Sequence, residues 1–470
     1  MRLKAVSFLF FGSLFYNAAT AQPVSERLAR VWQRFESDSQ LRAAMASLYV
    51  EEAGTGTVLF EKNAATGLAT ASTLKVITAA TAYELLGKDF RFTTRFAHDG
   101  SVDKGRLTGS LYIIGGGDPS LGSWRWKTTG TDSVLARVTR AVSARGIRSY
   151  PGGVTVTAPG WNEEAIPDGW TWNDIGQYYG AASTGVSWHE NQFDIKLQPG
   201  TKAGDSVRLV SAVPDPGQTV IIRALTGAPG SGDNSYLYHA IGVPCSSEGM
   251  GPVLRGTLPP GKAITVSGSL PDPGFTLLSD LRTALDKQVE LRPPHRLPPP
   301  TEDTAKLTIF HREQSPPLDS LCYWFLRRSI NLYGEAFLKA IALRQAGTAS
   351  TQKGAAAVKA FWKERGIDPV ELGVRDGSGL SPENRVTTHA QVQVLQYARK
   401  QAWFGGYFAG FPTYNDMRMK SGTISAVKGF CGYHKSKDGK EYVFSFLVNN
   451  YNGRESSIVQ KMYAVLNELK

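Results

Sequence analysis

The sequence predicts an α+β fold with a large β-rich insertion, and three observations support this prediction. Helical and strand-like patterns alternate before residue 88 and again after residue 301. Residues 89–300 instead contain many Gly, Pro, Ser and Thr residues, short alternating strands and little helical periodicity. The chain has 470 residues, 41% of them hydrophobic, so it can bury more than one core. We predict one discontinuous α+β domain, residues 22–88 and 301–470, and an inserted β-rich region, residues 89–300, divided into two small subdomains.

The residues before the first domain, 1–21, are predicted to form a signal peptide. Two basic residues, Arg2 and Lys4, precede an apolar run at 5–15, and small residues at 19–21 form the cleavage site. No later stretch approaches the ~20 consecutive apolar residues that a transmembrane helix requires. We therefore expect export to the periplasm and no transmembrane segment.

The first part of the discontinuous domain should contain helix, hairpin and helix. Residues 26–44 have the pattern of an amphipathic helix, and residues 47–50 and 57–60, separated by a segment with Gly54 and Gly56, have the pattern of the two strands of a β-hairpin. Residues 72–86 are apolar nearly all round and end at Gly87, a residue type that commonly stops helices. This second helix should therefore be buried at the centre of the domain.

The inserted region and the second part of the domain follow. Alternation at 111–114 is typical of the insert's short strands, and the prolines of residues 292–300 favour an extended connection at its end. The remaining predicted elements are helices at 318–346 and 353–364, strands at 428–433 and 442–449 around an Asp438-Gly439 turn, and a helix at 456–469.

Charge and cysteine usage restrict the possible partners. The formal net charge of +11 suits an anionic polymer or membrane surface, although ordinary surface composition explains it equally well. Peripheral association with membrane or cell wall thus stays open. No Lys/Arg block or aromatic-basic interleaving indicates nucleic acid as a partner.

No cofactor or metal is predicted. Cys245, Cys322 and Cys431 are odd in number and widely separated, so they form neither a disulfide framework nor a zinc site on their own. One disulfide with one free thiol remains open. The seven histidines show no zinc-hydrolase spacing such as H-E-x-x-H.

A candidate nucleophile heads the buried helix. In Ser72-Thr73-Leu74-Lys75 the Ser-x-x-Lys spacing places the lysine amine one helical turn from the serine oxygen, on the same face. Burial should lower the pKa of Lys75 toward that of a useful base. The simpler interpretation is that Ser72 only caps the helix. Three other Ser-x-x-Lys matches begin at Ser101, Ser350 and Ser425. The first lies in a turn, the second in a polar stretch and the third in a predicted strand, so only Ser72 heads a buried helix.

Two further motifs complete a pattern. Ser329-Ile330-Asn331 and Lys420-Ser421-Gly422 are the only matches in the chain to S-x-N and K-[S/T]-G. With S-x-x-K they make the sequence similar to the penicillin-recognising serine enzymes, whose three motifs line one cleft. The long stretch between Ser72 and Ser329 resembles the low-molecular-mass class C penicillin-binding proteins, which are D-alanyl-D-alanine carboxypeptidases and endopeptidases. The resemblance implies a penicillin-binding-protein/serine β-lactamase-like transpeptidase domain with a large β-rich insert.

The resemblance implies a role for each motif residue. Ser72 is acylated, Lys75 takes its proton, Ser329 relays a proton to the leaving amine, Asn331 holds the substrate amide, and Lys420 attracts a terminal carboxylate. Gly422 would let a substrate lie against the strand, Ser421 and Ser425 would bind substrate beside it, and the backbone N–H groups of Ser72 and Thr423 would form the oxyanion hole.

The insert carries a second, less specific pattern. In relatives, an acid after Trp-Asn and an aromatic residue five positions later bind the amino end of the substrate side chain, and here these positions are Asp174 and Tyr179. An aromatic core of the insert is the alternative. Two departures are Pro382, where relatives often carry an arginine, with Arg385 nearby, and a short segment at 401–420.

The function implied is hydrolysis of D-Ala-D-Ala termini or D,D cross-links of peptidoglycan peptides, with β-lactams as covalent inhibitors. Two alternatives stay open: a non-catalytic peptidoglycan-binding scaffold that kept the fold, and a serine β-lactamase, for which no deacylating carboxylate can be assigned. A Ser-His-Asp hydrolase is disfavoured because no G-x-S-x-G motif occurs.

Overall fold

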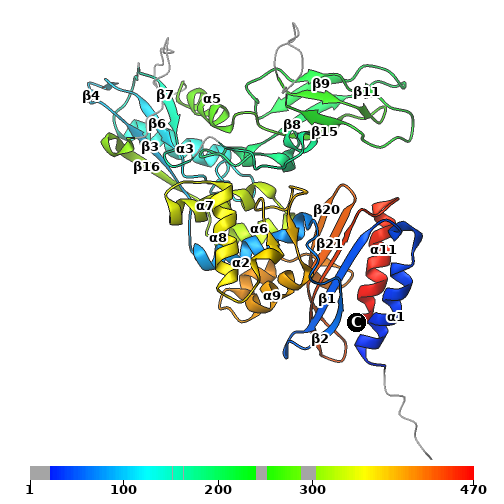
Figure 1. Ribbon diagram of the computed structural model, residues 1–470. Helices are drawn as coiled ribbons and strands as arrows, with labels where there is room; N and C mark the ends of the chain where they lie inside the picture. The colour runs from blue at the N-terminus through cyan, green and yellow to red at the C-terminus, as the bar shows by residue number, and fades with distance from the viewer. Residues whose placement is uncertain (1–21, 151, 162–163, 240–250, 287–302) are drawn as a thin grey trace, which may run out of the picture.

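The computed structural model describes residues 22–150, 152–161, 164–239, 251–286 and 303–470 (Figure 1). The signal peptide, the proline-rich connection and Cys245 lie outside these residues. In Figure 1 a helical and sheet-containing body lies below, and most of the insert, in cyan and green, lies above it. The described part of the chain has no helix that is both long and apolar enough to cross a bilayer.

The lower body contains a six-stranded sheet that joins both ends of the chain. Its order is β19 (Thr413–Tyr414), β20 (Met417–Ile424), β21 (Val427–Lys435), β22 (Glu441–Asn449), β1 (Met45–Glu52) and β2 (Val58–Lys62). All neighbours are antiparallel, and β1 pairs along its whole length with β22. The long runs of buried residues in β21 and β22 arise because helices cover both faces of the sheet.

Two helices cover one face of this sheet, α1 (Val24–Glu36) and α11 (Glu455–Leu466). Their apolar stripes bury Leu28, Trp32 and Ile458 against sheet residues such as Phe446.

The other face packs against a helical layer. It consists of η2 (Ala71–Leu74) with α2 (Lys75–Leu85), α6 (Leu318–Arg328), α7 (Asn331–Ala346), α8 (Thr351–Lys363), α9 (Thr388–Arg399) and α10 (Phe404–Ala409). The nine residues from Lys75 to Tyr83 are buried, as expected for a helix that is apolar all round. The α+β prediction is confirmed, and α2 is its central helix.

The insert buries two separate clusters of its own. One lies around the sheet of β3 (Thr93–His98), β6 (Leu111–Ile114), β7 (Val154–Thr157) and β16 (Thr308–Gln314), packed by α3 (Thr131–Ala144) and α5 (Pro273–Asp286). The other lies around β8 (Gln192–Gln198), β9 (Arg208–Val213) and β15 (Ile264–Ser269). The division at residues 88 and 301 remains a prediction, and β16 pairs with β3 although it follows residue 301.

Several predicted elements have different bounds. The helix predicted at 318–346 is two helices, because Ser329 adopts a left-handed conformation with φ 58° between α6 and α7. The helix predicted at 26–44 ends at Glu36, where the Asp38 side chain caps a separate short turn. Ser425 lies in the turn after β20 and not on a strand. Helices α3, α5 and α9 were not predicted.

Candidate active site

A cavity of about 700 Å³ is lined by residues of both the helical layer and the insert. Seven sequence-predicted site residues line it: Ser72, Ser329, Asn331, Thr423, Ser425, Asp174 and Tyr179. The other four, Lys75, Lys420, Ser421 and Gly422, are not among its lining residues. Residues of the first two motifs therefore line one cavity, whereas the third motif, Lys420-Ser421-Gly422, reaches it through the residue that follows, Thr423.

Lys75 lies at the centre of the polar contacts. Its Nζ is 2.9 Å from Ser72 Oγ, and it donates to Asn331 Oδ1 at 2.7 Å and to the carbonyl oxygen of Ser378 at 2.6 Å. The side chain is fully buried. Burial, and to a smaller extent the nearby Lys420 charge, lower the pKa of Lys75 well below its usual value, although Asp376 and Glu335 oppose the shift. A neutral amine beside a serine hydroxyl is therefore favoured here.

Gly422 allows β20 to lie directly against the backbone of Ser72. A Cβ atom at this position would lie 2.8 Å from the Ser72 backbone nitrogen and 2.8 Å from the Thr70 carbonyl oxygen. Real Cβ atoms do not approach backbone so closely, so no larger residue fits without moving the strand. The glycine of the K-[S/T]-G motif thus sets the spacing between β20 and the turn that carries Ser72.

Asn331 connects Lys75 with the insert. It is the first residue of α7, its Oδ1 accepts from Lys75, and its Nδ2 donates to the carbonyl oxygen of Tyr179 at 2.7 Å. Ser329, two residues earlier, lines the cavity from the left-handed turn that ends α6. The helix break that the sequence did not reveal is therefore what presents the S-x-N motif.

Lys420 is 2% exposed and donates to the carbonyl oxygen of Ser421 at 2.7 Å. Burial, with Lys428 nearby, lowers the pKa of Lys420 to about 7, although Cys431 opposes the shift. Thr423, further along the strand, donates to Glu455 Oε1 and accepts from Lys428 Nζ. The Thr423 hydroxyl is thus occupied, which leaves its backbone as the part that could contact a ligand.

Asp174 and Tyr179 form a pair on the insert wall. The Tyr179 hydroxyl donates to Asp174 Oδ1 at 3.2 Å, and Thr171 donates to the other carboxylate oxygen at 2.7 Å. Burial and the Asp174 charge raise the pKa of Tyr179, so its hydroxyl stays protonated. Trp172 and Tyr178 are exposed, so these two aromatic neighbours do not form a core.

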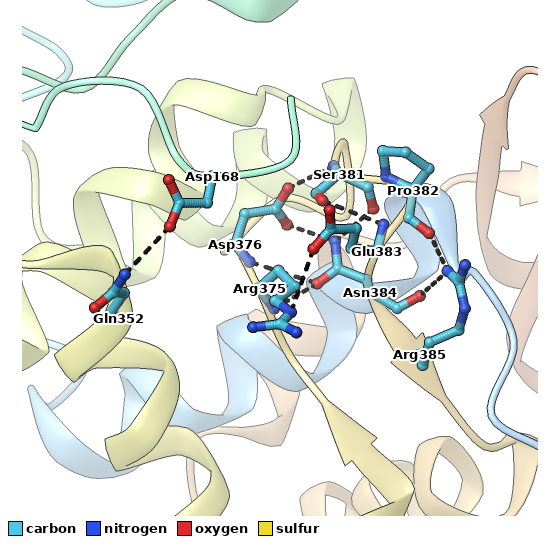
Figure 2. Close-up of polar contacts among 9 residues, drawn as sticks. All are labelled: Asp168, Gln352, Arg375, Asp376, Ser381, Pro382, Glu383, Asn384 and Arg385. Atoms are coloured by element: carbon cyan, nitrogen blue, oxygen red, sulfur yellow. Dashed lines mark hydrogen bonds and ion pairs between the residues drawn. The ribbon is translucent and has the colours of Figure 1, made fainter. Parts of the chain in front are cut away.

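A loop from Arg375 to Arg385 holds the Ser378 carbonyl that contacts Lys75. Figure 2 shows the polar contacts at the two ends of this loop. The buried Asp376 carboxylate accepts from the backbone N–H groups of Gly379 and Ser381 and from the side chains of Asn384 and Trp170. Because Trp170 belongs to the insert, this hydrogen bond ties the insert to the loop that orients the lysine.

The same loop contains Pro382, at the position where relatives often carry an arginine. Pro382 lines the cavity, whereas Arg385 donates to the carbonyl oxygens of Pro382 and Asn384 and does not line it. Arg375 instead lies 3.6 Å from Glu383. Neither arginine of the loop lines the active-site cavity.

The family model that matches the chain is the D-Ala-D-Ala carboxypeptidase 3 (S13) family, over residues 28–469. The chain belongs to this family. The match covers nearly the whole described chain, and with it the prediction of a serine-type D-Ala-D-Ala peptidase is confirmed.

Two relatives of this chain are named D-alanyl-D-alanine carboxypeptidases, and a solved structure has the same fold. The D-alanyl-D-alanine carboxypeptidase of Actinomadura sp. (strain R39) is 25% identical over 457 residues, covering 91% of this chain and 82% of the relative. D-alanyl-D-alanine carboxypeptidase DacB of Haemophilus influenzae is 23% identical, covering 84% and 83%. The crystal structure of penicillin-binding protein 4 from Haemophilus influenzae superposes with a TM-score of 0.77 at 20% identity, covering 94% of this chain and 99% of that one. The fold with its large insert is shared along the full length.

Sequence reasoning missed several groups of this S13 site. Glu190 lines the cavity and accepts from Ser123, Arg125 and the Tyr333 hydroxyl at 2.7–3.0 Å. No motif marks it, because its partners come from distant segments. Glu335, one turn after Asn331 in a largely buried helix that also contains Lys339, accepts from Gly377 N–H, and burial raises its pKa to about 8. The available sequence signal for Glu335 was that it is the one acidic residue of α7.

Proposed function

We propose that Ser72 is the nucleophile of this D-Ala-D-Ala peptidase and that Lys75 is the base that takes its proton. The observation that carries the proposal is the 2.9 Å contact between Ser72 Oγ and a lysine amine without solvent exposure. A neutral amine has two N–H groups, and the carbonyl oxygens of Asn331 and Ser378 occupy both. Its lone pair is then directed to the Ser72 hydroxyl.

The chemistry follows from this arrangement. The Ser72 oxygen attacks the penultimate D-Ala carbonyl as its proton moves to Lys75, and the tetrahedral oxyanion is held by the backbone N–H groups of Ser72 and Thr423. The C–N bond then breaks, and the proton passes through Ser329 to the leaving amine. Water adds to the acyl carbon, Lys75 takes its proton, and the Ser72 hydroxyl is restored.

Substrate contacts are proposed for the remaining residues. Lys420, when protonated, attracts the terminal carboxylate, and Asn331 binds the substrate amide. The substrate lies against β20 at Gly422, with Ser421 and Ser425 beside it. On the opposite wall, Asp174 and Tyr179 bind the amino end of the side chain of a peptidoglycan peptide.

The two alternative functions have less support. A non-catalytic scaffold would not need a buried lysine at hydrogen-bond distance from Ser72. A class A serine β-lactamase uses a carboxylate that activates water at the acyl-enzyme. Among the described cavity-lining residues the carboxylates are Asp174 and Glu190, and each already accepts hydrogen bonds from its own neighbours. A peptidase that deacylates through Lys75 fits this arrangement better.

We also propose that β-lactams acylate Ser72 and that the mature chain, beginning at Gln22, works in the periplasm. A β-lactam complex of the Haemophilus protein has been solved. N-terminal sequencing of protein recovered from a periplasmic extract tests the cleavage site, and an N-terminus at Met1 would contradict it.

The nucleophile is tested with a fluorescent penicillin. Wild-type protein, Ser72→Ala and Ser101→Ala are incubated with the reagent and separated on a denaturing gel, with boiled protein as a blank. Ser101 heads another Ser-x-x-Lys sequence and is exposed, so it is the matched control. We expect a band in the wild type and in Ser101→Ala and none in Ser72→Ala. Label that persists in Ser72→Ala would show a different nucleophile, and no label in the wild type would favour the scaffold.

A further inference from the structure

A second cavity, of about 440 Å³, lies at the other end of the β20–β21 strand pair. It shares no lining residue with the active-site cavity. Residues from α9, α10, β20, β21 and β22 line it, among them Arg399, Arg418, His434, Phe404, Phe408 and Tyr433. We call it the Arg418 cavity. No residue of the three catalytic motifs contributes to it.

Three buried nitrogen atoms in the walls of the Arg418 cavity have no hydrogen-bond partner. They are Arg399 Nη1, Arg418 Nε and His434 Nε2. Buried polar atoms in folded proteins are almost always paired, since an unpaired one loses its hydration without compensation. These three atoms have almost no accessible surface, so they lie behind the cavity wall and do not themselves contact a ligand; the accessible parts of the same side chains line the cavity.

The charged residues that line the cavity indicate whether its ligand is an anion or a cation. Arg399 and Lys435 lie 2.5 Å and 3.7 Å from the two carboxylate oxygens of Glu441. Asp416 lies 3.2 Å from Lys470.

Arg418, in contrast, donates from Nη2 only to the backbone carbonyls of Phe408 and Ala409, at 2.9 and 3.1 Å. It has no ion pair with any carboxylate in the described chain. The two acids that line the cavity, Asp416 and Glu441, pair with other cations. The Arg418 guanidinium therefore has no counter-ion among the described residues that line the cavity.

Aromatic rings form the rest of the wall. Tyr433 packs edge-on against Phe404 and Phe408, with ring centroids 5.5 and 5.6 Å apart, and the Arg418 guanidinium lies 5.0 Å from the Phe408 ring. Such a wall favours an apolar group beside the anion. We propose that the Arg418 cavity binds a carboxylate that carries an apolar side chain, either a free organic acid or the C-terminal residue of a peptide.

The proposal is tested by calorimetric titration of the full mature protein with three probes. They are N-acetyl-phenylalanine, its C-terminal amide, and the tripeptide N-acetyl-Ala-Ala-Phe with a free carboxylate. We expect the acid to bind at least about tenfold more tightly than the amide, because a charge-assisted hydrogen bond is lost with the carboxylate. Tighter binding of the tripeptide than of the acid identifies a peptide terminus, and the reverse identifies a free acid.

Substitutions of residues that line the Arg418 cavity test whether the probes bind there. Arg418→Gln should weaken binding of the acid by about ten- to a hundredfold and His434→Leu by a few fold. The control is Arg328→Gln, which removes a guanidinium that lines the active-site cavity, and it should leave the affinity unchanged. His434 keeps the test valid if Arg418→Gln unfolds. Equal binding of acid and amide, no binding of either acid, or equal weakening by Arg328→Gln would overturn the proposal.

Discussion

The two walls of the active-site cavity are built differently. On the helical wall, Ser72, Lys75 and Asn331 belong to a buried layer in which Lys75 contacts three oxygen atoms. On the insert wall, Asp174 and Tyr179 come from a helix of four residues and a short turn, beside exposed aromatic rings. The fold therefore places the proposed chemistry in its rigid core and the proposed recognition in its insertion. Substitutions on the first wall should change rate constants, and those on the second should change substrate affinity.

The largest effect is expected for Lys75→Arg. Arginine stays protonated where Lys75 is a neutral amine, so it cannot act as the base, and acylation by penicillin should fall by about 10²- to 10⁴-fold. The second-order acylation rate constant measures it. The control is Lys104→Arg, in an exposed Ser-x-x-Lys sequence of the insert, which should retain the wild-type rate. A wild-type rate in Lys75→Arg would exclude Lys75 as the base.

A smaller effect should appear in the pH profile through Lys420. Because its pKa is lowered to about 7, the lysine is charged below that pH and loses its charge above it. For a peptide with a terminal carboxylate, kcat/KM should therefore fall above pH 7, by about tenfold per pH unit once well past the pKa. Lys420→Arg keeps its charge and should abolish this alkaline fall. If the fall persists in Lys420→Arg, another group causes it.

The insert wall should affect affinity and not chemistry. Asp174→Asn should raise KM about three- to tenfold for a peptide whose third residue carries a free side-chain amine. The matched control is the same peptide with that amine acetylated, for which wild type and variant should differ little. Penicillin labelling, which does not use this group, should be unchanged. A drop in kcat without a change in KM would place Asp174 in the chemistry and remove the distinction between the walls.

The smallest effect on rate is expected for the hydrogen bond that joins the walls. Trp170→Phe removes the donor to Asp376 and leaves a buried acceptor with one partner fewer. We expect the free energy of unfolding to drop by about 1–3 kcal/mol, measured by denaturant titration. The acylation rate should fall by less than about threefold, because Asp376 keeps its three other hydrogen bonds. A large rate loss at unchanged stability would show that the insert controls Lys75 directly.

The features that the sequence predicted are those with local patterns. Ser72 and Lys75 lie one helical turn apart, and the hairpin and the C-terminal strands are short apolar runs bounded by turn residues, so the local pattern is sufficient. Helix α3 was missed although Val134, Val138 and Val142 are spaced by four, since Ser, Thr and Arg residues between them hide its apolar stripe. The break at Ser329 was missed because the pattern on each side of it is helical.

The parts of the site that were missed depend on contacts between distant segments. Glu190 meets Arg125 and Tyr333 only after folding, and the role of Asp376 depends on Trp170 from the insert. The roles assigned to Asp174 and Tyr179 remain predictions.

The pairing of β1 with β22 also has a consequence for biosynthesis. The sheet that positions Lys420 beside Ser72 is complete only when strands from both chain ends have met. Closing so long a loop is a late step, since nonlocal strand pairing has the largest entropy cost during folding. A chain still being translated therefore contains Ser72 and Lys75 before the sheet that carries Lys420 can close. Activity against the cell wall is thereby delayed until synthesis of the enzyme has ended.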